Sequence, residues 1–205
     1  MTAPARTRTV APAWPLYLAA FAIAAVVAGA VGEAFSGGSL AELGIPDPGA
    51  ATTVGLPALR GVAWLLMALA TGSFLLSAFL IPPKQTQQDL NGARLTVDGH
   101  LASRTGAHAS AGIALIGLAM IPLVLSDVSG QPLKTVLFEA AAWSQALDQV
   151  ADARVWLIVA VFAAVVAAFG YAASSWWSQV WLFVGAIVVV MPIALTGHSA
   201  TGGAH

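Results

Sequence analysis

Residues 155–173 of the chain read VWLIVAVFAAVVAAFGYAA, and residues 176–196 read WWSQVWLFVGAIVVVMPIALT, with only two serines between the runs. A helix needs about 20 apolar residues to cross the hydrocarbon core of a bilayer. A strand with open edges would leave backbone groups unpaired in lipid. Each run therefore predicts a membrane-spanning helix, and the short break between them predicts that the two helices are antiparallel neighbours.

Three more apolar runs precede these two, at residues 14–35, 54–81 and 106–126. The second of them stops at Pro82-Pro83, which cannot continue a helix. We therefore predict an all-α, polytopic transmembrane helix bundle of about five spans, forming a single membrane domain over residues 1–205.

The composition supports a bilayer as the solvent. The chain is 59% hydrophobic and only 8% charged, whereas a water-soluble domain carries roughly 25% charged residues. The net charge of −1 gives no basic surface for a nucleic acid, so none is expected as a partner. The absence of cysteine excludes disulfides, thiol catalysis and thiolate metal sites.

The loop charges predict the orientation. Cytoplasmic loops of membrane proteins carry an excess of Lys and Arg. Five of the eight basic residues fall on one predicted side, namely Arg6, Arg8, Lys84, Arg94 and Arg104. We therefore expect a multi-pass protein of the cytoplasmic membrane, with its N-terminus inside and its C-terminus outside.

Two further patterns concern packing. Between spans three and four, apolar residues recur at helical spacing over residues 136–150, which predicts a short amphipathic helix at the outer surface. Small residues recur every four positions in two spans, and such residues let helices approach closely. They are Ala24, Ala28 and Gly32 in span one, and Ala160, Ala164 and Ala168 in span four.

The strongest metal-ligand candidates lie at the end of the chain. His198 follows span five directly, His205 comes seven residues later, and Met191 lies seven residues before His198. A thioether favours Cu(I), and imidazole binds copper in either oxidation state. This combination points to copper. The alternative is that His198 is an interfacial polar residue and Met191 a core residue.

Span three contains a similar but weaker pattern of candidate ligands. Met120 and Asp127 are also seven residues apart, near the predicted outer end of the span. They are candidate contributors to the same metal site, with ordinary packing as the alternative for Met120.

One structural ion pair is expected at the same end of the bundle. Glu33 ends span one, and Arg60 lies about 9 Å into span two at 1.5 Å per residue. Charged groups at this depth are costly unless they are paired or reach the interface, so we predict that Glu33 pairs with Arg60, with outward extension of the Arg60 side chain as the alternative.

Haem and catalysis are not expected. A haem held by two histidines needs them at matching depth, but His108 falls near the inner face and His198 near the outer one. His108 reads as an interfacial polar residue instead. No sequence pattern pairs a nucleophile with a base, so the chain is not expected to be an enzyme.

Four motifs stand out in the chain: GIPDPGA at 44–50, GLPALR at 55–60, LSDV at 125–128 with QPL at 131–133, and PIALTGHSA at 192–200. Together they resemble the actinobacterial copper resistance D proteins. In that group this domain is often the N-terminal part of a fusion to a cytochrome c oxidase assembly domain of the CtaG type. The resemblance implies copper handling at the membrane: transport, tolerance or delivery towards the oxidase. It also implies a role for His198 within Thr196-Gly197-His198, and more loosely for His205.

Proteins of the family that this chain resembles continue beyond the position of His205 into further spans. The resemblance therefore leads us to expect that the chain is truncated relative to a longer protein, in which later residues complete the site. A second hypothesis remains open from the sequence. The protein could be a structural or assembly subunit that binds no metal and docks onto a respiratory complex, such as cytochrome oxidase, by its small-residue faces and its outer amphipathic helix.

Overall fold

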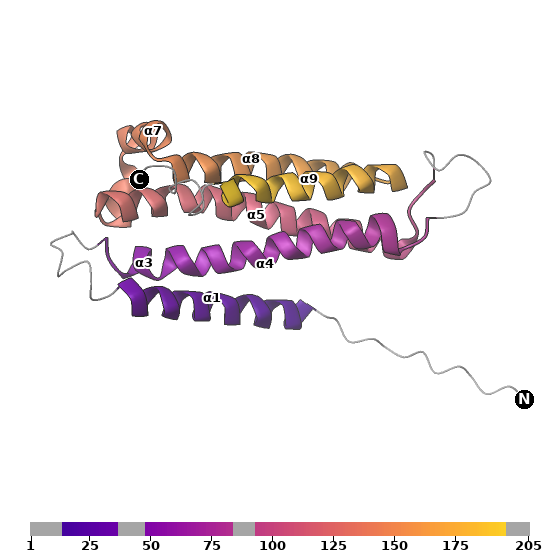
Figure 1. Ribbon diagram of the computed structural model, residues 1–205, viewed down its shortest axis with the longest axis horizontal. Helices are drawn as coiled ribbons and strands as arrows, with labels where there is room; N and C mark the ends of the chain where they lie inside the picture. The colour runs from indigo at the N-terminus through magenta and orange to yellow at the C-terminus, as the bar shows by residue number, and fades with distance from the viewer. Residues whose placement is uncertain (1–13, 37–47, 84–92, 196–205) are drawn as a thin grey trace, which may run out of the picture.

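The computed structural model describes residues 14–36, 48–83 and 93–195, and these ranges contain helices and no strand. Five helical segments are long and apolar enough to cross a membrane, which confirms the predicted all-α, five-span architecture (Figure 1). They are α1 (Trp14–Ser36), α4 (Gly55–Leu75) continued by the π-helix η1 (Leu76–Leu80), α5 (Val97–Ser129), α8 (Ala151–Ala172) and α9 (Trp176–Leu195).

The short helices lie at one end of the bundle. α3 (Ala50–Thr53) precedes α4, and α6 (Leu133–Phe138) and α7 (Ala140–Gln149) connect α5 to α8 (Figure 1). The predicted amphipathic helix over 136–150 is therefore two helices, because the backbone is extended at Glu139. We call this the Asp152 end, and the opposite end, where α5 and α9 begin, the Arg94 end.

Helix α5 begins at Val97, nine residues before the predicted start of span three. The Thr96 hydroxyl caps it by accepting a hydrogen bond from the Gly99 N–H at 3.3 Å. The helix ends at Gly130, whose φ of 65° is the left-handed conformation that glycine adopts at a helix C-terminus. Hydropathy detects only the apolar part of such a helix, so the polar first turns were missed.

Helix α5 forms the centre of the bundle. Its most extensive contacts are with α8, followed by α4, while α9 packs on α8 and α4. Close approach of α5 and α8 depends on glycine: a Cβ built on Gly117 would lie 2.9 Å from Ala160 Cβ, and one on Gly170 would lie 2.9 Å from Ala107 Cβ. The core of the protein lies along this interface.

Only one of the two predicted small-residue stripes is correct as a whole. On α8, Ala160 is buried, but Ala164 and Ala168 are exposed, and the buried alanines are instead Ala163 and Ala167. The alanines that α8 buries advance by steps of three and four residues, at Ala160, Ala163 and Ala167, so the four-residue step from Ala160 to Ala164 falls outside the buried face. The stripe on α1 does mark an interface, described next.

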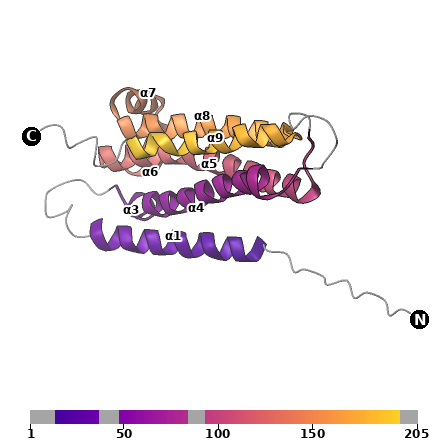
Figure 2. The same ribbon diagram turned by 45° about the vertical axis from the view of Figure 1, so that its right-hand side comes forward.

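Helix α1 lies at the edge of the bundle, beside α4 (Figure 2). A Cβ built on Gly61 of α4 would lie 3.0 Å from Ala28 Cβ and 3.3 Å from the Ala24 carbonyl oxygen, and one on Gly32 would meet the ring of Pro57. Most of the α1 surface faces away from the protein, since only 6% of its most apolar segment is buried. α1 therefore packs mainly against one other spanning helix, α4, and small residues make this contact.

The Phe74 ring occupies a gap left by two glycines. Phe74 is fully buried in α4. A Cβ on Gly106 of α5 would lie 2.9 Å from its ring, and a Cβ on Gly170 of α8 would lie 3.3 Å from its Cζ. The ring therefore contacts two other spans at once.

The π-helix η1 ends against Pro82-Pro83, and this leaves a carbonyl without its usual partner. The N–H that would bond the Ala78 oxygen in an α-helix belongs to residue 82, and proline has none. The indole Nε1 of Trp176 donates to this oxygen at 2.6 Å. The first residue of α9 therefore completes the hydrogen bonding of the end of η1.

Replacing Trp176 with phenylalanine should lower the free energy of unfolding by about 1–2 kcal/mol, because it leaves the Ala78 oxygen unpaired while keeping an aromatic ring. Unfolding in mixed detergent micelles would measure the effect. Trp181→Phe is the control, since Trp181 is largely exposed. Equal stability of the two variants would contradict this role of the indole.

Candidate functional site

The predicted copper ligands His198 and His205 lie outside the residues that the structure describes. The last described element is α9, which ends at Leu195 and contains Pro192. The Thr196-Gly197-His198 motif follows it immediately in the sequence.

The two methionines of the predicted site have different surroundings. Met120 is fully buried in the core on α5, beside residues such as Ile121 and Val124. Met191 on α9 keeps 53% of its surface exposed. Met191 is therefore accessible to a ligand from outside the bundle, whereas Met120 is enclosed by packed apolar side chains.

Asp127 lies in the last turn of α5 and is exposed. Within residues 14–36, 48–83 and 93–195, no three His, Asp or Glu side chains come together as a metal site. The predicted ligands His198 and His205 lie beyond this part of the chain, so the copper site stays a prediction.

The structure gives Arg60 a different partner from the one we expected. Its Nη2 donates to Asp152 Oδ2 on α8 at 2.6 Å, in a half-exposed ion pair. Glu33 instead accepts a hydrogen bond from the Thr53 hydroxyl at 3.3 Å. The predicted Glu33–Arg60 pair was wrong, although both residues do lie at the Asp152 end.

The direction of the Arg60 side chain explains the difference. Helix α4 faces α1 with Pro57, Ala58 and Gly61, which contact residues of α1. At 100° per residue, Arg60 lies about a third of a turn away from the middle of this face. It therefore points away from Glu33 and reaches α8.

Reversing one charge of this pair should destabilise the protein, and reversing both should restore most of the loss. We expect Asp152→Arg alone to bring two cations together, while Arg60→Asp combined with Asp152→Arg recovers the attraction. Because both side chains are more than a third exposed, the coupling energy should be only about 0.2–1 kcal/mol. A double-mutant cycle of unfolding measures it, and zero coupling would contradict the pairing.

A buried chain of hydroxyls also lies at the Asp152 end. The Thr52 and Ser126 hydroxyl oxygens are 2.7 Å apart, and Ser126 donates to the Gln131 carbonyl at 2.6 Å. These bonds tie α3 to the end of α5. Sequence analysis missed them, because isolated Ser and Thr residues give no pattern.

Two other polar side chains are buried closer to the Arg94 end. Neither the Gln179 amide on α9 nor the Ser103 hydroxyl on α5 has a hydrogen-bond partner within the described part of the protein. Both residues are fully buried. The only sequence signal for Gln179 is an amide within an otherwise apolar run.

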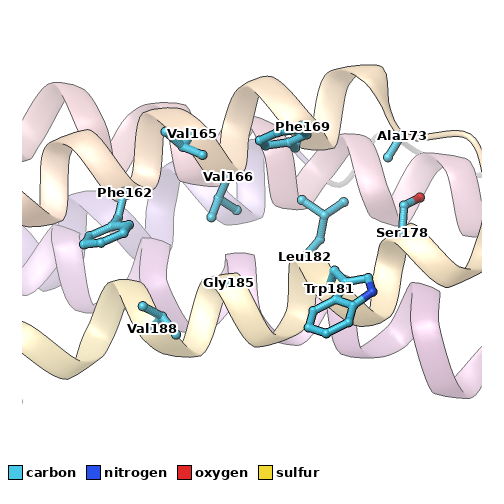
Figure 3. Close-up of a pocket in the computed structure, with 10 residues that line it drawn as sticks. All are labelled: Phe162, Val165, Val166, Phe169, Ala173, Ser178, Trp181, Leu182, Gly185 and Val188. Atoms are coloured by element: carbon cyan, nitrogen blue, oxygen red, sulfur yellow. The ribbon is translucent and has the colours of Figure 1, made fainter.

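A groove of about 360 Å³ runs between α8 and α9 (Figure 3). It is lined by Phe162, Val165, Val166, Phe169, Ala173, Ser178, Trp181, Leu182, Gly185 and Val188. Its only hydroxyl, on Ser178, already donates to the Ser175 carbonyl at 2.6 Å. This apolar lining offers no strong metal ligand.

The two described histidines lie at the Arg94 end of α5. His108 Nδ1 is 2.6 Å from the Arg104 carbonyl, and its ring packs edge-on against Tyr171 of α8 with centroids 5.2 Å apart. His100 Nε2 accepts a hydrogen bond from Arg104 Nε at 3.4 Å. These imidazoles therefore have structural partners and lie far along the bundle from the end of α9.

Comparison with known proteins identifies a family. The family model described as copper resistance protein D-like, N-terminal domain, matches residues 50–205, about three quarters of the chain. No protein with a curated description and no solved structure matches the chain. The matched range contains four of the five spans, and α1 precedes it.

Proposed function

Because the chain belongs to the family of the copper resistance protein D-like N-terminal domain, we propose that it handles copper at the cytoplasmic membrane. The role would be copper transport, tolerance or delivery towards cytochrome oxidase assembly. The observation that carries this proposal is the family match over residues 50–205, which includes Thr196-Gly197-His198 and His205.

The ligand chemistry supports copper. Imidazoles from His198 and His205 and a thioether from Met191 make a soft donor set, and the chain has no cysteine that could replace it. Met191 is half exposed on α9 and so is available as a ligand. The exposed Asp127 carboxylate is a further candidate ligand for the ion. Binding by the Met120 sulfur would require the core to open.

Copper in this proposal is cargo and not a resident cofactor. The protein would bind and pass on the ion without a catalytic step, and no haem is assigned to it. Met and His ligands suit copper as cargo because thioether donors favour Cu(I) and imidazole binds copper in either oxidation state.

The first experiment measures Cu(I) binding by purified protein under reducing conditions. His198→Ala should weaken binding by at least about tenfold, because loss of even a supporting residue around a metal ligand costs 10–100-fold in affinity. Met191→Leu, which keeps the volume and removes the sulfur, should weaken binding less. His108→Ala is the control, since His108 lies at the Arg94 end.

Negligible copper in both the wild type and His198→Ala would overturn the proposal. Equal losses in His198→Ala and His108→Ala would show that the histidine at the end of α9 has no special role. Copper binding that is retained in His198→Ala would show that other residues of the chain form the site.

A second candidate function is that of an assembly subunit. Phe138 of α6 is 90% exposed at the Asp152 end, and most of α1 is free of contacts with the rest of the protein. Both features favour docking onto another membrane protein. Co-purification with oxidase subunits in the absence of bound copper would favour this function over the first.

A further inference from the structure

A hollow at the Arg94 end has the properties of a small binding site. It measures about 330 Å³ and is lined by Arg94, Leu95, Thr96, Val97, His100, Leu101 and Ser174. Backbone hydrogen bonds fix its base: Leu95 N–H donates to the Ser174 carbonyl at 3.2 Å, and Trp176 N–H donates to the Ala93 carbonyl at 2.8 Å. The segment before α5 is thereby held against the turn between α8 and α9.

The hollow is positively charged. Arg94 is exposed, and its guanidinium has no hydrogen-bond or ion-pair partner in the described ranges of the chain. Arg104 lies one turn beyond His100, donates to the imidazole at 3.4 Å, and stacks over the Tyr171 ring at 5.5 Å from its centroid. Arg94 therefore brings an exposed positive charge to the hollow, and a second arginine is held nearby.

Hydroxyl donors accompany the charge. Thr96 Oγ1 accepts from the Gly99 N–H, so its own hydrogen remains available to donate. Ser174, a second residue with a hydroxyl, also lines the hollow. The acidic residue of this turn, Asp98, is exposed and lies two positions before His100, about 200° around the helix from it. Guanidinium and hydroxyl donors together suit a phosphate group.

The hollow opens where a bilayer would place its headgroups. Trp176 and Trp177 start α9 at this end, and tryptophan marks the interface between membrane and water. Two apolar side chains beside the hollow are largely exposed, Val97 by 77% and Leu101 by 61%. Acyl chains lying over these two side chains would remove their apolar surface from water.

We propose that this hollow binds the headgroup of an anionic phospholipid, such as phosphatidylglycerol. Arg94 contacts the phosphate, Thr96 and Ser174 donate to its oxygens, and Arg104 adds positive charge. The acyl chains lie along Val97 and Leu101. Bound lipid would add to the backbone hydrogen bonds that hold the segment before α5 against the start of α9, independently of any copper site.

Native mass spectrometry of the purified full chain tests the proposal, with phosphatidylglycerol and phosphatidylcholine offered in equal amounts. The wild type should retain phosphatidylglycerol preferentially. Arg94→Gln should lower this preference about fivefold, the contribution expected of one basic residue at an anionic membrane surface. Arg94→Lys should keep most of it, since the charge remains.

Arg154→Gln is the matched control, because Arg154 is an exposed arginine at the opposite end of the bundle. It should leave the preference unchanged. Equal retention of the two lipids by the wild type, or equal effects of Arg94→Gln and Arg154→Gln, would overturn the proposal. Displacement of the lipid by millimolar inorganic phosphate would also overturn it, by showing a site for the free anion.

Discussion

Replacing Phe74 with alanine should lower the free energy of unfolding by about 3 kcal/mol, the lower end of the range for deleting a buried aromatic ring. The ring fills the space opposite Gly106 and Gly170, so its loss leaves a cavity between α4, α5 and α8. Lipid is as apolar as the core, so the loss comes from missing packing contacts more than from hydration. Unfolding by SDS in mixed micelles measures the change.

Phe169→Ala is the control for this experiment. Phe169 lies on α8 and is 66% exposed, so its removal creates no enclosed cavity. We expect its effect to be much smaller. Similar destabilisation by the two substitutions would contradict the assignment of Phe74 as the ring that joins three spans.

Replacing Gly117 with valine should also destabilise the protein by about 3 kcal/mol, because inserting atoms into a tight interface forces the backbones apart. A Cβ at this position would lie 2.9 Å from Ala160 Cβ and 3.0 Å from the Trp156 carbonyl oxygen, and a backbone atom cannot rotate away. α5 and α8 would have to separate along the most extensive interface of the bundle. The same unfolding assay measures this loss.

Gly72→Val is a closely matched control, since it makes the same substitution inside a spanning helix. A Cβ on Gly72 would meet nothing within 4 Å. Any general effect of removing glycine from a helix therefore appears in both variants. If Gly72→Val were as destabilising as Gly117→Val, close approach of α5 and α8 would not be the cause.

The five spans were predictable because each depends on a run of apolar residues that the bilayer itself requires. The helix boundaries were less predictable. Thr96 caps the start of α5 within a polar segment. Extended backbone at Glu139 divides the predicted surface helix. Both features depend on local hydrogen bonds and backbone angles, which hydropathy does not report.

Pairs of side chains could not be predicted, because the sequence does not show towards which neighbour each face of a helix is turned. Glu33 and Arg60 were placed at the correct end of the bundle. However, α4 is rotated so that Arg60 pairs with Asp152, 92 positions later in the chain. The bond between Thr52 and Ser126 spans 74 positions and has no sequence signal. The copper ligands His198 and His205 stay a prediction from residue chemistry and family resemblance.

The peripheral place of α1 has a consequence for how the protein assembles. A helix that is apolar on nearly all sides is stable alone in lipid, and it then joins its neighbours mainly by packing. α1 meets α4 through Gly32, Ala28 and Gly61 and buries little surface, and the Glu33 carboxylate at its end accepts a hydrogen bond from Thr53. We therefore expect the four later spans to form the folding nucleus, with α1 added as a separate and reversible last step.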